Sequence, residues 1–140
     1  MENKSNMELI KEYIETCSLL KNGKINVDYL KDKPQNYSID KTPSNPIYKD
    51  YRDGSCLKQI IFDFTVQAPL SSQAIVNLAN SKFCEDFMSW IEGNNRRGVL
   101  PNIKGIQWIK CTSPGYILGK TETTAIYIIQ MQVVYREEAL

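Results

Sequence analysis

The chain has 140 residues and a hydrophobic content of 42%, which suits one globular domain with a substantial core. Its 17 Lys and Arg nearly balance its 16 Asp and Glu, which argues against a general electrostatic attraction to nucleic acid. The absence of histidine excludes Ser-His-Asp, Cys-His and zincin chemistry, and no run of about 18 apolar residues predicts a membrane span.

The remaining chemistry-bearing residues do not form a recognisable site. Cys17, Cys56, Cys84 and Cys111 are widely spaced without a CxxC motif, so we expect reduced thiols and no zinc knuckle. The polar N-terminus lacks the apolar segment of a secretory signal, so we expect the protein to stay in the compartment where it is made. We therefore expect no catalytic residues, no cofactor and no metal.

The first third of the chain predicts one helix and a long loop. Apolar residues recur with a helical period over residues 6–20, after a cap at Ser5 or Asn6 and before a stop at Gly23. Residues 22–55 are predicted to be a long irregular loop, with a short strand at 37–41 and a turn at Asp53-Gly54. Irregular loops of this length are often functional.

The rest of the chain alternates between strand and helix patterns. Residues 56–68 predict a strand, 72–93 one kinked helix or two joined ones with caps at Ser71 or Ser72 and at Ser81, and Gly93 a stop. A strand that breaks at residues 113–115 and a last strand at 124–136 follow. The order favours an α+β fold, with a single antiparallel or mixed sheet of about four strands and helices packed on one face.

The two long strands share an unusual second face. One face of each is apolar, whereas the other mixes amides and aliphatics with little charge, a composition typical of a surface that another subunit covers. We expect this subunit interface to include Tyr48, Tyr51, Gln59, Ile61, Ile128, Gln130 and Gln132. The alternative is that the 22–55 segment folds over this face. Arg96 and Arg97 could make a basic contact or simply interact with the helix dipole.

Several motifs spread over nearly the whole chain resemble tail-terminator-type proteins from phages and prophages of Gram-positive bacteria. They are "LKNGKINVDYL" at 20–30, "YSID" at 37–40, "NPI" at 45–47, "YRDGS" at 51–55, "FCEDFMSWIE" at 83–92 and the final "VVYRE". The resemblance implies a tail-terminator-like fold and a structural virion protein at the junction between tail and neck, assembled in the host cytoplasm.

The resemblance also implies the partners. Such a protein forms a homo-hexameric ring on the head-proximal end of the tail tube, ends tube polymerisation and joins the tail to the neck connector. DNA passes through the lumen without sequence-specific binding, no membrane is involved, and contact with the tail sheath stays open. The alternatives are another neck adaptor or tube-like virion component and, more remotely, a small-ligand enzyme.

Overall fold

A computed structural model describes residues 4–20, 25–27, 36–69, 74–120 and 124–138. Two helices and seven strands lie in these ranges. In chain order they are α1 (Asn6–Ile14), β1 (Asn26–Val27), β2 (Asn36–Lys41), β3 (Ile47–Asp50), β4 (Cys56–Pro69), α2 (Ala74–Arg97), β5 (Ile106–Cys111), β6 (Tyr116–Lys120) and β7 (Thr124–Glu137).

The long strands β4 and β7 form the middle of the sheet. They pair antiparallel along their whole length, from Cys56 opposite Glu137 to Pro69 opposite Thr124. At the Cys56 end, β3 flanks β4 and β5 flanks β7; at the other end β2 and β6 take these places. β1 extends the sheet by pairing parallel with β2. The α+β class is therefore confirmed, but the described residues form seven strands instead of about four.

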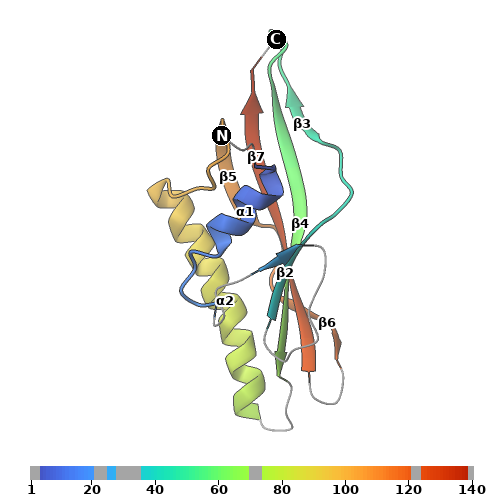
Figure 1. The fold of residues 1–140 in the computed structure, drawn as a ribbon, viewed down its shortest axis with the longest axis vertical. Coiled ribbons are helices and arrows are strands. Elements are labelled where there is room, and N and C mark those ends of the chain that lie inside the picture. The colour runs from blue at the N-terminus through green and yellow to red at the C-terminus, as the bar shows by residue number, and fades with distance from the viewer. Residues whose placement is uncertain (1–3, 21–24, 28–35, 70–73, 121–123, 139–140) are drawn as a thin grey trace.

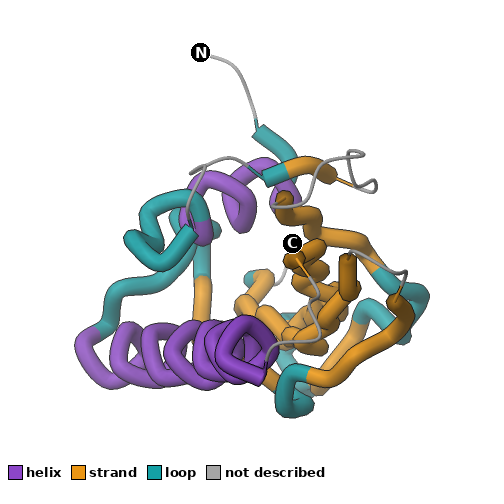
Figure 2. Tube along the Cα trace, turned by 90° about the horizontal axis from the view of Figure 1, so that it is seen from below, coloured by secondary structure: helices purple, strands orange, loops and turns teal. Residues whose placement is uncertain are grey.

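Both helices lie on the same side of the sheet, as Figures 1 and 2 show. The alternation of β4 and β7 points one face of each strand at the helices, and Phe62, Phe64, Ile129 and Met131 on this face are fully buried. The ring of Phe87 from α2 stacks on Phe64 with centroids 4.4 Å apart. The apolar face of the sheet is the one that the sequence predicts to be the core.

Helix α1 is shorter than predicted. Its N-cap is Ser5, whose Oγ accepts a hydrogen bond from the backbone N–H of Glu8 at 3.2 Å. The helix ends at Ile14 and not near residue 20, and the Thr16 hydroxyl then donates to the Tyr13 carbonyl at 2.6 Å. Such a local hydrogen bond competes with continued helix. The predicted stop at Gly23 lies outside the described residues.

Helix α2 is one continuous helix of 24 residues. The predicted second cap at Ser81 and stop at Gly93 are wrong, because both residues lie inside it. The helix ends at Gly98, whose φ of 73° is the left-handed conformation that glycine adopts readily. Ser71 and Ser72, the predicted first caps, lie outside the described residues. Neither described helix combines the length and the apolar content that a membrane crossing requires.

The segment 22–55 is more regular than predicted. It contains β1 and β3 in addition to the short strand expected at 37–41, which the structure extends to Asn36–Lys41. The turn at Asp53-Gly54 is confirmed, with a φ of 90° at Gly54 and hydrogen bonds from the Ser55 N–H and hydroxyl to Asp53 Oδ1 at 2.9 and 2.6 Å. This turn joins β3 to β4 and fixes the hairpin at the end of the sheet.

Candidate interaction surface

The second face of the sheet, opposite the helices, carries a ladder of hydrogen-bonded side chains at the β3 end. Gln59 on β4 donates its Nε2 hydrogen to the carbonyl of Asn45 at 2.8 Å. Gln132 on β7 donates to Gln59 Oε1 at 2.9 Å, and the Trp108 indole on β5 donates to Gln132 Oε1 at 3.1 Å. The ladder therefore links three strands and fixes both amides in one orientation.

An aromatic pair covers this ladder. The Tyr48 ring from β3 meets the Trp108 ring edge to face, with centroids 5.6 Å apart. The Lys110 ammonium lies 4.5 Å from the centroid of Trp108, within the range of a cation–π contact. Val134, which lies between Gln59 and Trp108 in the strand register, is fully buried, whereas Tyr48 is 48% exposed. The two rings thus support each other, and Tyr48 leaves about half of its surface open to solvent.

A further aromatic ring, that of Tyr51, lies in the hairpin between β3 and β4. Tyr51 is 37% exposed, and the charged ends of Lys49 and Arg136 each lie 5.4 Å from its centroid. Arg136 is held in place by the hydroxyl of Ser55 at 3.1 Å and by the carboxylate of Asp53 at 4.0 Å. We call Tyr48, Tyr51 and Trp108, together with the cations Lys49, Lys110 and Arg136, the aromatic patch.

The structure brings some of the predicted interface residues together and separates others. Tyr48, Gln59 and Gln132 meet through Trp108, and Tyr51 lies in the adjoining hairpin. Gln130 is exposed and Ile61 half-buried further along the same face. Ile128 is only 6% exposed, between Thr65 and Tyr116 in the strand register, so it has little surface to offer a partner.

The two predicted basic residues lie elsewhere, in the last turn of α2. Arg97 donates from Nη2 to the side-chain oxygen of Asn94 at 2.6 Å. Its guanidinium also lies beside Gly93, where a Cβ would be 3.2 Å from Nη1. Arg96 is largely exposed and lies 3.9 Å from Glu92, one helical turn earlier. Surface pairs of this kind contribute little to stability, so Arg96 is available for other contacts.

Sequence reasoning missed Trp108, Lys110 and Arg136. Alternation along β5 places Trp108 and Lys110 on the face opposite the buried Ile109, which is a signal that the sequence does contain. Their proximity to Tyr48 could not be predicted, because it requires the register in which β5 and β3 flank the central pair on opposite sides.

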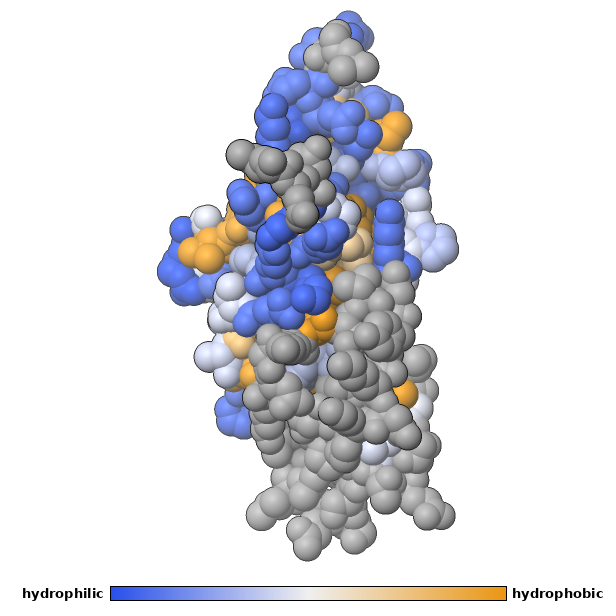
Figure 3. All heavy atoms as spheres, viewed as in Figure 1, coloured by the Kyte–Doolittle hydropathy of each residue, from blue (hydrophilic) through white to orange (hydrophobic). Residues whose placement is uncertain are grey.

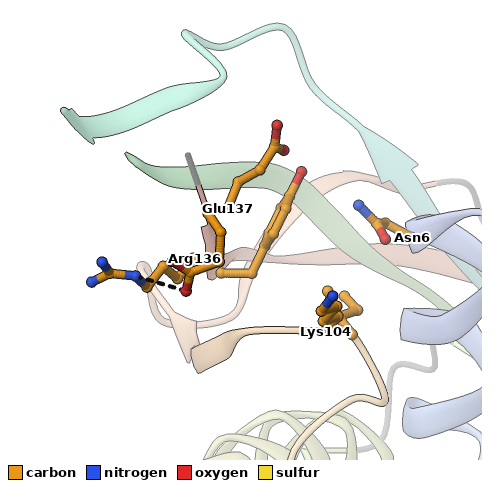
Figure 4. A pocket seen from close by; sticks show the side chains of 7 residues that line it. Asn6, Lys104, Arg136 and Glu137 are labelled. Atoms are coloured by element: carbon orange, nitrogen blue, oxygen red, sulfur yellow. Dashed lines mark hydrogen bonds and ion pairs between the residues drawn. The ribbon is translucent and has the colours of Figure 1, made fainter. Parts of the chain in front are cut away.

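Two hollows in the described part of the chain each share one residue with the aromatic patch, Arg136 in the first and Lys110 in the second. One of about 400 Å³ lies at the end of β7, and Figure 4 shows Asn6, Lys104 and Glu137 around it. The other, of about 380 Å³, lies between α2 and β5 and includes Cys111. Burial raises the pKa of the Cys111 thiol to about 12, so it is protonated and unreactive at neutral pH. Within the described ranges no three His, Cys, Asp or Glu side chains gather as a metal site would require.

The hydropathy of the surface is mixed. Figure 3 shows hydrophobic residues as separate spots among hydrophilic ones on the side that it displays. Among the described residues the large exposed apolar side chains are Ile47, Tyr48, Tyr51, Val99, Tyr116 and Ile117. Most of them lie in or beside the edge strands β3 and β6, which occupy opposite ends of the sheet on the side away from α2 (Figure 1).

Comparison with known proteins identifies the fold and no more. No family model matches the chain, and no curated protein matches it. A solved structure whose name describes no function superposes with a TM-score of 0.54 at 10% sequence identity, covering 99% of this chain and 100% of the other. At this identity the likeness concerns the arrangement of helices and strands alone.

Proposed function

We propose that this chain is a structural subunit of a phage or phage-like tail, which caps the head-proximal end of the tail tube as a ring and joins it to the neck. The observation that carries the proposal is the pair of exposed edge strands, β3 with Tyr48 and β6 with Tyr116 and Ile117. The kind of assembly, a ring on the tail tube, is proposed from the resemblance of the sequence motifs to tail-terminator-type proteins.

A ring built head to tail needs two different contact surfaces on every subunit. β3 pairs with β4 at one end of the sheet and β6 pairs with β7 at the other, so the two exposed edges are separate in space. Edge strands also present backbone groups that a neighbouring chain can pair with. The subunit thus carries surfaces for two neighbours without using the helix-covered face.

The aromatic patch fits the role of an anchor at one of these contacts. Tyrosine and tryptophan bury large areas at low entropic cost and are enriched among residues that dominate binding energy. Tyr48 and Trp108 are held in place before binding by their mutual contact and by the bond from Trp108 to Gln132, so ordering them costs little on assembly. The cations beside them supply polar contacts at the rim.

We expect the double substitution Tyr48→Ala with Tyr51→Ala to weaken assembly by about 30-fold or more, the effect of one binding hot spot of about 2 kcal/mol. Folding should change little, because both side chains are exposed. Mass photometry of the purified protein, alone and with tail tubes, measures the change. The matched control is Val99→Ala, which removes an apolar side chain that is 49% exposed next to α2.

If the double variant and the control change assembly equally, the assignment of the aromatic patch as a contact surface is contradicted. Urea unfolding of both variants, with a midpoint close to that of the wild type, shows that any loss of assembly comes from the surface and not from misfolding.

A further inference from the structure

Two carboxylates face each other on adjacent strands of the second face. Asp40 on β2 lies directly opposite Asp63 on β4 in the strand register. Side chains at such positions have Cβ atoms about 4.5–5.5 Å apart, and like charges there weaken the pairing of the strands. When both carboxylates are ionised, β2 is therefore joined to the sheet across a pair of repelling groups.

The two carboxylates have different surroundings. Asp40 accepts hydrogen bonds from the buried hydroxyls of Ser38 and Thr65, each at 2.8 Å. Asp63 has no such support, because its Oδ1 is buried and accepts no hydrogen bond from the described part of the chain. Asp63 is thus the member of the pair on which a proton is favoured.

The groups around the pair do not offset its charge. On the β7 side, Asp63 lies opposite the neutral Gln130, and the next pair along is Ile61 with Gln132. The cations on this face lie toward the hairpin end of the sheet: Lys110 of β5 is opposite Gln132 and over the ring of Trp108, and Lys49 and Arg136 are both opposite Leu57. Within β2, Lys41 alternates to the other face, opposite Phe62. No ion pair to either carboxylate is recorded within the described residues.

We propose that the Asp40–Asp63 pair is a proton-binding device that couples the attachment of β2 to pH. When Asp63 takes up a proton, the repulsion across the β2–β4 ladder ends and β2 is held more tightly. Because β2 also carries β1 at the outer side of the sheet, the device acts on the whole β1–β2 edge. The inference is independent of the proposed function, since it rests on the register and burial alone.

The direction of the pH dependence follows from the folded and unfolded states. Burial, and then the charge of Asp40, raise the pKa of Asp63 above its ordinary value. An acid whose pKa is raised by folding destabilises the fold fully at a pH above the folded pKa. This penalty falls as the pH drops through the folded pKa and disappears below the unfolded one. Mild acid therefore strengthens this part of the sheet.

The test compares the wild type with Asp63→Asn by urea unfolding from pH 7.5 to pH 3.5. At pH 7.5 we expect the folding equilibrium constant of Asp63→Asn to be about twofold to fivefold larger, the range for one repelling cross-strand pair. The difference should shrink as the pH falls. Amide hydrogen exchange should slow by a similar factor in β2 and its partner residues of β4.

The matched control is Asp53→Asn, because folding shifts the pKa of Asp53 in the opposite direction from that of Asp63. Hydrogen bonds from Ser55 and the nearby charge of Arg136 lower the pKa of Asp53. Neutralising it should destabilise the fold at pH 7.5, and this difference too should shrink in acid. If removing any negative charge had the same general effect, the stability of both variants would change in the same direction.

A carbon-13 titration of the aspartate carboxyls in the wild-type protein gives an independent reading. The proposal expects Asp63 to titrate at a higher pH than Asp53. It is overturned if Asp63 titrates at or below its ordinary value, or if Asp63→Asn folds and shows the same pH dependence of stability as the wild type. If Asp63→Asn fails to fold, the wild-type titration alone decides.

Discussion

Replacing Phe64 with Ala is expected to lower the free energy of unfolding by about 3–5 kcal/mol, the usual cost of removing a fully buried Phe. Phe64 has no exposed surface and stacks on two rings, Phe87 of α2 at 4.4 Å and Tyr37 of β2 at 6.0 Å between centroids. It therefore joins the centre of the sheet both to the long helix and to β2, which lies between β4 and β1. The cavity left by its loss is surrounded by rigid neighbours and cannot collapse easily.

Urea unfolding measures this loss. The matched control is Tyr116→Ala on β6, where an aromatic side chain that is 41% exposed is removed, with an expected change within about 0.5 kcal/mol. A loss at Phe64 below about 1 kcal/mol would mean that the buried face of β4 has been assigned wrongly.

The second large effect is expected at Gly105, in the turn before β5. Its φ is 79°, and a Cβ at this position would lie 2.3 Å from the carbonyl oxygen of Arg136. A backbone hydrogen bond joins the two residues here, since the Arg136 N–H donates to the Gly105 carbonyl at 2.8 Å. Gly105→Ala therefore adds a steric clash with backbone to a left-handed conformation, with an expected cost of about 2–5 kcal/mol.

Gly98→Ala is the matched control for Gly105→Ala. Gly98 has a similar φ of 73°, but a Cβ there meets no atom within 4 Å. Its substitution should cost only the conformational strain, about 1–2 kcal/mol. Equal losses of unfolding free energy at the two glycines would contradict the close approach of the turn to the end of β7.

The long strands could be predicted because their pattern has a physical cause that is local. Alternating apolar and polar residues can bury only one face of a strand, so the residue pattern alone determines which side of β4 and β7 meets the helices. Phe62, Phe64, Ile129 and Phe87 are in the core as this pattern predicts. The Ser5 cap, one of the two candidates in the sequence, and the predicted Asp53-Gly54 turn are equally local.

The short strands β1 and β3 could not be predicted from the sequence, because pairing with a distant strand creates them. β3 has only four residues, all exposed, and its regular conformation depends on β4 beside it. The uninterrupted course of α2 through Ser81 and Gly93 has the same origin. Packing of Phe83, Phe87 and Ile91 against the sheet outweighs the local preferences of these residues for a helix end.

Part of the candidate interaction surface can be recognised in the sequence. The amides of Gln59 and Gln132 and the rings of Tyr48 and Tyr51 stand out in composition, whereas their connection through Trp108 depends on strand order. Alternation gives the face on which Ile128 lies, but it does not show that Ile128 is nearly buried there. Here β6 adds a further strand beside β7, with Tyr116 opposite Ile128.

The most direct test of the central claim, that this chain caps the tail tube, is electron microscopy of lysates from a strain in which its coding sequence is deleted. We expect filled heads together with tubes of uncontrolled length that are not joined to them, and restoration of normal particles when the wild-type chain is supplied in trans. A cap acts by occupying the growing end of the tube, so its absence should leave tube initiation intact. Tails of normal length attached to heads in the deletion strain would contradict the account.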